Sequence, residues 1–158
     1  MTEQPAASES LLRFATHLLP AGDDLTLIIL KGHLLIEEQL NARLSAVARK
    51  PQILPEARLR FHALSKVCMA LFYGENSAEE WFWSAIAKLN TIRNDLAHHL
   101  ETPKLEAKIY EMLHTLEQDV PFRPLAFNGS REARTRSALA FLYGVVEGMR
   151  TRSGPRAE

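Results

Sequence analysis

Apolar residues recur at three- and four-residue spacing along most of the chain. At about 100° per residue this spacing gathers them on one face of an α-helix, and no stretch shows the period of two and the turn residues of a β-hairpin. The pattern predicts an all-α fold, a single-domain helical bundle of about five to six helices. Prolines, glycines and capping residues bound the expected helices at about 10–19, 24–48, 56–72, 78–100, 104–119 and 130–152.

The breaks between these helices carry recognisable capping chemistry. Asp23 or Asp24 is expected to cap the second helix with its carboxylate. Ser77, three residues before a glutamate, has the spacing of a capping box and is expected to open the fourth helix, which ends near Thr102. The segment Pro51–Pro55 is expected to be a loop.

The composition is that of an ordinary globular domain. A chain of 158 residues, 46% hydrophobic and 24% charged, can bury one sizeable core but not two. We expect residues 8–152 to form that domain, with flexible termini at 1–7 and 153–158. No apolar run approaches the about 20 residues that span a bilayer, and the N-terminus lacks a secretory signal, so a cytoplasmic protein without a membrane partner is expected.

Charge is balanced overall but unevenly distributed. The 19 basic and 19 acidic residues cancel, which predicts no strong overall attraction to nucleic acid. A basic segment comprises Arg43, Arg49, Lys50, Arg58, Arg60 and Lys66, with Glu56 as its one acid, and the chain is basic again from Arg123 onward. Two basic segments beside a polar groove suit a modest RNA binder, whereas charged runs more often mark a solvated face.

Residues 90–98 combine polar side chains in a pattern suited to chemistry. Asn90, Asn94 and His98 are four residues apart and form one polar ridge of the predicted helix. Arg93 projects about 25° from the middle of the apolar stripe of that helix, where a partly desolvated guanidinium needs a carboxylate, a phosphate or carbonyl oxygens. The stripe consists of Phe82, Ile86, Leu89, Leu96 and Leu100.

This stretch resembles the R-x4-6-H motif of the HEPN domain family (higher eukaryotes and prokaryotes nucleotide-binding), with Arg93, Asn94 and His98 in the sequence RNDLAH. The Arg-Asn pair, the small residue before the histidine and the place late in a long helix also fit, and the resemblance covers about residues 8–150. It implies a small all-α domain, usually dimeric. Many members are metal-independent endoribonucleases whose paired motifs meet at the dimer interface. Leu100 stands where a toxin subclass has a tyrosine that a nucleotidyltransferase partner modifies, so that form of regulation is not implied here.

Metal-independent RNA cleavage needs a base, an acid and a cation for the charge that builds on the phosphorus. We predict Arg93, Asn94 and His98 as the catalytic residues: the guanidinium for the phosphate, the amide to orient the phosphate or the imidazole, and the imidazole as base or acid. One such histidine per chain supplies a single proton-transfer group, which predicts a homodimer with two copies across a cleft.

A second polar ridge, formed by His33, Glu37 and Asn41, lies on the helix over 24–48. Because apolar residues occur on nearly every side of this helix, the ridge is expected to face other protein, with Glu37 or Glu38 as the carboxylate that fixes Arg93. We predict Asn90, Glu37 and Asn41 as substrate-binding residues. Polar residues satisfied inside the bundle, or on a dimer surface, are the alternative interpretation.

The remaining residues that bear chemistry suggest structural roles. Cys68 is expected to be a buried thiol, and Trp81, Trp83 and the Phe72-Tyr73 pair are expected to be core anchors at helix ends. His17, His62 and His114 are expected to be surface or satisfied core histidines. No metal or cofactor is expected, because His98 and His99 point about 100° apart on one helix and no nucleotide-binding or hydrolase motif is present.

The predicted function is that of a HEPN-like metal-independent endoribonuclease, a toxin or a defence effector. Its expected partners are RNA as substrate, a second copy of the chain and a cognate antitoxin or other regulatory protein. One alternative is a non-catalytic HEPN-like binding or transcriptional regulatory module, since some helical regulators of sugar operons carry a similar Arg-Asn-x-x-Ala-His stretch. The other is a polar helix–helix clamp in an unrelated helical protein.

Overall fold

A computed structural model describes residues 6–72, 80–99, 104–119 and 128–149. These residues form helices and contain no strand, which confirms the all-α prediction. The elements are α1 (Ala6–Leu18), η1 (Leu19–Ala21, a 3-10 helix), α2 (Leu25–Val47), η2 (Pro51–Ala57, also 3-10), α3 (Phe61–Phe72), α4 (Glu80–His98), α5 (Leu105–Asp119) and α6 (Arg131–Gly148).

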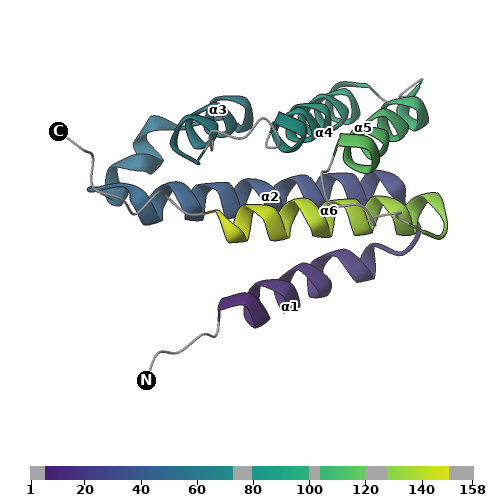
Figure 1. The fold of residues 1–158 in the computed structure, drawn as a ribbon, viewed down its shortest axis with the longest axis horizontal. Coiled ribbons are helices and arrows are strands. Elements are labelled where there is room, and N and C mark those ends of the chain that lie inside the picture. Colours follow the sequence, from purple (N-terminus) through teal and green to yellow (C-terminus); the bar gives the residue numbers. More distant parts are fainter. Residues whose placement is uncertain (1–5, 73–79, 100–103, 120–127, 150–158) are drawn as a thin grey trace.

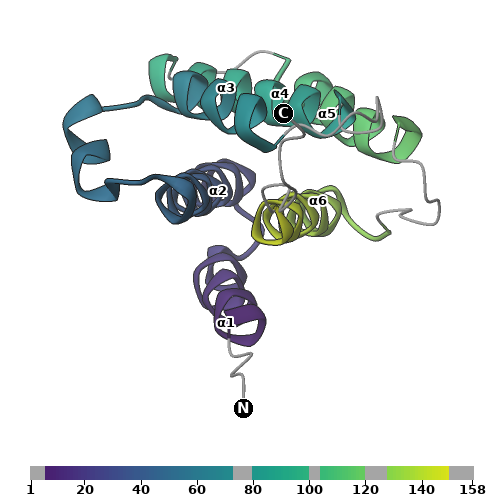
Figure 2. The same cartoon turned by 60° about the vertical axis from the view of Figure 1, so that its left-hand side comes forward.

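The helices are stacked in three layers (Figures 1 and 2). α2 and α6 lie side by side in the middle, α3, α4 and α5 lie across one side of them, and α1 covers the other. α2 and α6 run in the same direction. Near the N-terminal ends of the two helices, Nη2 of Arg136 lies 3.7 Å from Oδ1 of Asp23. Near their C-terminal ends, Nη1 of Arg43 donates to the carbonyl oxygen of Glu147 at 3.2 Å.

The close contact between α2 and α6 depends on Gly32. A Cβ atom added at this position would lie 2.5 Å from Cδ1 of Leu139, a side chain that is completely buried. The lack of a side chain at Gly32 therefore leaves room for Leu139 of α6. As a result α2 and α6 pack closely, and α2 supports the layer that contains α3 and α4.

The apolar stripe of α4 faces the core as predicted. Phe82, Ile86 and Leu89 are at most 2% exposed, and Leu96 packs against the same core. Leu100 lies outside the described residues. A continuous buried stripe holds α4 in one orientation, so the polar side of the helix is fixed as well.

Cys68 is buried, also as predicted. Its Sγ lies 3.6 Å from the carbonyl oxygen of Leu40, and burial raises the pKa of the thiol to about 11. The thiolate is therefore scarce near neutral pH, which fits a structural role.

The predicted cap Asp24 is in place, and Ser130, which was not predicted as a cap, caps α6. The carboxylate of Asp24 accepts from the backbone N–H of Leu27 at 3.0 Å, and the hydroxyl of Ser130 accepts from that of Ala133 at 3.2 Å. Each side chain satisfies a backbone donor that the first turn of a helix leaves open. The predicted capping residue Ser77 lies outside the described residues.

Several predicted boundaries are wrong. Pro51–Pro55 is part of η2 rather than a loop, because a proline ring already holds φ near the helical value and tolerates a first turn. α3 begins at Phe61 and not near residue 56, since Arg58 has a left-handed backbone (φ 45°) that ends η2. α4 ends at His98, earlier than predicted.

The predicted termini are only partly described. α1 begins at Ala6, earlier than the predicted start near residue 10. Residues 1–5 and 153–158 lie outside the described residues.

Candidate functional site

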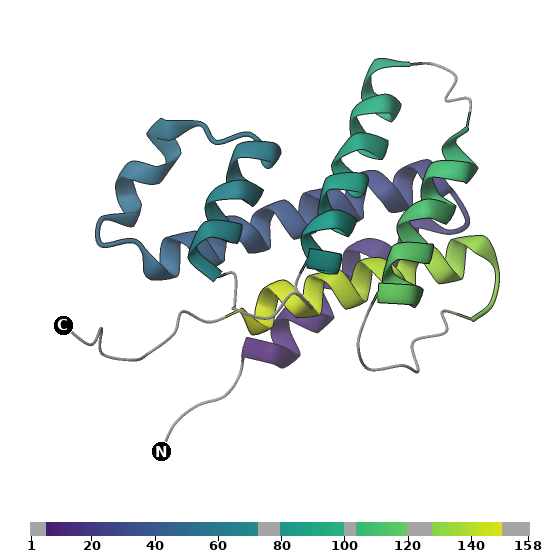
Figure 3. The same ribbon diagram turned by 45° about the horizontal axis from the view of Figure 1, so that its top comes forward.

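A cavity of about 630 Å³ opens where α2, α3 and α4 meet, and we call it the polar cavity. In Figure 3 the first turn of α3 and the last turns of α4 lie on the same side of α2. The lining residues are His33 and Glu37 of α2, Arg60, Phe61 and His62 at the start of α3, and Asn90, Arg93, Asn94 and His98 of α4.

The structure brings most of the predicted site residues together. Glu37 from α2 and Asn90, Arg93, Asn94 and His98 from α4 all line the polar cavity. On α4 the cause is helical spacing, since residues three, four and eight apart share one side of the helix.

Asn41, predicted to bind substrate, does not line the cavity. Its side chain is exposed and donates from Nδ2 to the backbone oxygen of Glu37 at 3.1 Å, inside its own helix. Asp95, within the motif, also points elsewhere, because its carboxylate forms an ion pair with Lys108 of α5.

Arg93 is half-buried, and its Nη1 donates to Oδ1 of the neighbouring Asn94 at 3.2 Å. Among the residues described here, no carboxylate lies within ion-pair distance of it. The prediction that Glu38 fixes Arg93 is wrong, because Glu38 is paired with Arg13 at 2.5 Å. Glu37 is not in direct contact either and acts on Arg93 through charge.

The surroundings of Glu37 favour its protonated form. Burial is the largest cause and raises the pKa of its carboxyl; the positive charge of Arg93 lowers it, and the negative charge of Glu38 raises it. The balance is a raised pKa, so Glu37 keeps its proton to a higher pH than an ordinary glutamate.

His33 forms the floor of the cavity and is 4% exposed. Its Nε2 lies 3.3 Å from Oδ1 of Asn90, a contact in which the Nε2-protonated tautomer donates, and its ring centroid lies 4.0 Å from that of Phe61. The pKa of His33 is lowered to about 4: burial is the largest cause, the bond to Asn90 raises the pKa in part, and the charge of Arg93 lowers it. His33 is therefore neutral at pH 7 and serves to hold Asn90.

Arg60 and His62 were not predicted as site residues. Phe61, which lies between them in the sequence, is buried (5% exposed) and packs on the ring of His33, so it anchors the first turn of α3 on α2. The backbone N–H of Leu64 donates to the carbonyl of Arg60 at 2.9 Å, and the hydroxyl of Ser65 donates to that of His62 at 2.8 Å.

The sequence contained one partial signal for these residues, the basic segment that includes Arg60. Of that segment Arg60 alone lines the polar cavity, and Arg43 instead binds the backbone of α6. His62 is exposed, as expected of a surface histidine, and it also lies on the wall of the polar cavity.

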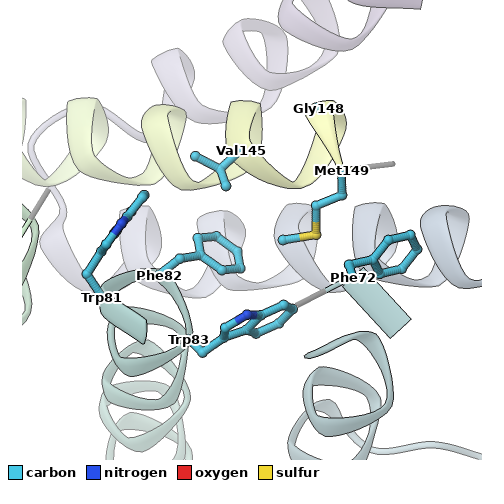
Figure 4. A pocket seen from close by; sticks show the side chains of 7 residues that line it. All are labelled: Phe72, Trp81, Phe82, Trp83, Val145, Gly148 and Met149. Atoms are coloured by element: carbon cyan, nitrogen blue, oxygen red, sulfur yellow. The ribbon is translucent and has the colours of Figure 1, made fainter. Parts of the chain in front are cut away.

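A second cavity, of about 320 Å³, lies at the other end of α4, and we call it the apolar pocket. Figure 4 shows its aromatic and aliphatic walls. The ring of Trp81 stacks on that of Phe141 at 5.6 Å, and those of Phe82 and Trp83 meet edge to face at 4.8 Å. Its lining residues are Phe72, Trp81, Phe82, Trp83, Val145, Gly148 and Met149, none of them titratable. Phe72, Trp81 and Trp83 are thus packing residues at helix ends, as predicted, while Tyr73 lies outside the described residues.

The described part of the chain holds no group of three histidine, cysteine or carboxylate side chains placed to bind a metal ion. None of the described helices is long and apolar enough to cross a membrane. The fold and the site thus define an all-helical bundle with one cavity that combines guanidinium, imidazole and amide groups. Comparison of the chain with protein-family models, curated proteins and solved structures found no match.

Proposed function

We propose that this protein is a HEPN-like, metal-independent endoribonuclease that binds and cleaves RNA in the polar cavity. One observation carries the proposal: Arg93, Asn94 and His98 line one cavity, and Arg93 has no carboxylate partner among the residues described. A structural clamp would require a partner for a half-buried guanidinium, whereas an open guanidinium suits an anionic ligand. The phosphodiester of RNA is such a ligand.

The residues of α4 match the needs of the reaction. The 2′-oxygen of the RNA attacks phosphorus as a base removes its proton, and the bond to the 5′-oxygen breaks as an acid protonates that oxygen, leaving a 2′,3′-cyclic phosphate and a 5′-hydroxyl. Arg93 places two N–H donors on the non-bridging oxygens, and Asn94 orients it through the bond between their side chains. His98 acts as base or acid.

A homodimer, a cognate antitoxin or regulatory protein, and a role as toxin or defence effector belong to the same proposal. Their support is the resemblance of RNDLAH to the HEPN motif, placed on α4 of an all-α bundle. The alternative, a non-catalytic binding or transcriptional regulatory module, uses the same cavity and differs in leaving the bound nucleic acid intact.

The test is cleavage of a single-stranded RNA oligonucleotide of mixed sequence, carrying a fluorophore and a quencher, in excess EDTA. His98→Ala should lower the rate by about 10²–10⁴-fold, the range for loss of a proton-transfer group. Arg93→Lys should lower it by about 10–10³-fold, because lysine keeps the charge and loses the two-pronged geometry. Cleavage should persist in EDTA, since the proposed chemistry uses no metal ion.

His99→Ala is the matched control, because this exposed histidine directly follows His98 and does not line the cavity. It should cleave like the parent protein, and His98→Ala should change the free energy of unfolding by no more than about 0.5 kcal/mol. Degradation that stops in EDTA and survives both site substitutions would identify a contaminating nuclease. Tight RNA binding without cleavage would favour the binding module.

A further inference from the structure

We infer that the two proton transfers of RNA cleavage are divided between His62 and His98 of one chain, with Arg60 as a second cation on the phosphate. This inference rests on the proposed function and assigns roles to residues outside the α4 motif. It makes the cavity of a single chain chemically complete.

The first argument is placement. Arg60 and His62 lie at the start of α3 and Arg93 and His98 on the last turns of α4, and all four line the same cavity. Each helix thus contributes one guanidinium and one imidazole. A phosphodiester between them can meet one imidazole on the side of the attacking 2′-oxygen and the other on the side of the leaving 5′-oxygen, as an in-line displacement requires.

The second argument is charge. The phosphorane formed during cleavage carries about two negative charges, one more than the bound diester, and two guanidiniums match that increase. The groups that face His62 across the cavity are Glu37 and His33 on α2 and Arg93 and His98 on α4. Glu37 is the one carboxylate in the lining, so two cations exceed one anion and leave the cavity suited to a phosphate.

The third argument is rigidity. Phe61 is buried against the ring of His33, and the first turn of α3 is closed by the bonds to the carbonyls of Arg60 and His62. His33 in turn holds Asn90 of α4. Contacts through His33 therefore connect the wall that carries His62 to the wall that carries His98, and hold the two helix segments that bear these histidines in a fixed relation.

The other titratable groups of the cavity suit the role less well. His33 is nearly inaccessible and already bonded to Asn90. Glu37 can exchange a proton, but its ionised form would repel the phosphate that the guanidiniums attract. His62 is exposed at the cavity wall and has no such conflict.

The proton balance is simple. One histidine, initially neutral, receives the 2′-hydroxyl proton as the new P–O2′ bond forms; the other, initially protonated, gives its proton to the 5′-oxygen as the P–O5′ bond breaks. Exchange with water afterwards restores both histidines. The chemistry needs no second chain, although the protein can still form a dimer.

The experiment compares His62→Gln with His98→Gln on the same RNA oligonucleotide. Both should lower kcat by about 10²–10⁴-fold. The parent should show a bell-shaped pH dependence of kcat/KM, and each of these two variants should lack one limb of it, whereas Glu37→Gln should keep both limbs. His114→Gln, an exposed histidine on α5 outside the cavity, is the control and should match the parent.

A second substrate separates the acid from the base. In RNA with a sulfur atom replacing the bridging 5′-oxygen, the thiolate leaves without protonation, so the variant that lacks the acid should recover activity and the variant that lacks the base should not. Mixing the two variants should restore nothing, because each site needs both histidines in one chain. A normal rate and pH dependence for His62→Gln, recovery on mixing, or loss of a limb in Glu37→Gln would overturn the inference. A parent protein that never cleaves RNA would instead refute the proposed function.

Discussion

The two ends of α4 lie in opposite surroundings. At the N-terminal end Trp81, Phe82 and Trp83 line the apolar pocket with residues of α3 and α6 (Figure 4). At the C-terminal end Arg93 and His98 line the polar cavity with residues of α2 and α3. One helix therefore serves both regions, and α3 borders both of them.

The side chains of the apolar pocket stabilise the fold, whereas those of the polar cavity are available for chemistry. Aromatic side chains in the apolar pocket contact one another and the core, and their burial stabilises the bundle. In the polar cavity Arg93 and His98 contribute little buried apolar surface, so their substitution leaves the helix anchored. We expect stability to respond to one end of α4 and activity to the other.

The largest expected effect is on stability at the apolar end. Phe82→Ala removes a side chain that is 2% exposed and should lower the free energy of unfolding by about 3–5 kcal/mol. Urea unfolding followed by circular dichroism measures the change. Thr91→Ala, an exposed position of the same helix, should stay within about 0.5 kcal/mol. RNA cleavage per folded molecule should be unchanged in both, and a selective loss of cleavage in Phe82→Ala would join the two regions into one functional unit.

A smaller effect links the polar cavity to stability through pH. The pKa of His33 is lowered from 6.5 to about 4 in the folded protein, so the unfolded chain binds the proton more readily. The contribution of neutral His33 to the free energy of unfolding is complete above pH 6.5. It is lost as pH falls from 6.5 towards 4, which lowers that free energy by up to about 3 kcal/mol. Urea midpoints across this range measure it. His33→Gln should flatten the dependence and His114→Gln should keep it; an equal slope in His33→Gln would assign the acid sensitivity to other groups.

The smallest expected effect concerns two adjacent carboxylates. Glu38 is paired with Arg13 at the surface, with both side chains about half exposed, so Glu38→Gln should cost no more than about 1 kcal/mol and leave RNA cleavage unchanged. Glu37→Gln removes the negative charge of the polar cavity and should lower KM for RNA several-fold. Steady-state kinetics at low salt measure both. If KM changed in Glu38→Gln and not in Glu37→Gln, the assignment of Glu37 as the carboxylate of the polar cavity would be wrong.

Helical periodicity, capping preferences and residue spacing predicted the features that depend on a single helix. The helical periodicity placed Phe82, Ile86 and Leu89 in the core, and the cap Asp24 followed from residue type and position. The spacing on α4 also put Arg93 and His98 on one wall. These features need no knowledge of how helices cross.

The errors in the predicted site residues arose where the packing of one helix on another determines which side chains reach the cavity. Arg60 and His62 reach the polar cavity because α3 starts at Phe61, after the left-handed residue Arg58, and crosses α2 beside α4. No spacing along the chain encodes that crossing. Asn41 has the same spacing from Glu37 as Glu37 has from His33, yet its amide binds the backbone of its own helix.

Cys68 provides a kinetic probe of the contact on which the polar cavity depends. It is the single cysteine of the chain, it is completely buried, and its thiol faces the carbonyl of Leu40, so it is shielded while α3 rests on α2. Alkylating reagents can modify it only when α3 separates from α2, so the labelling rate measures the free energy of that local opening. The movement would also displace Arg60 and His62, so the same free energy would give the fraction of molecules in which the polar cavity is assembled.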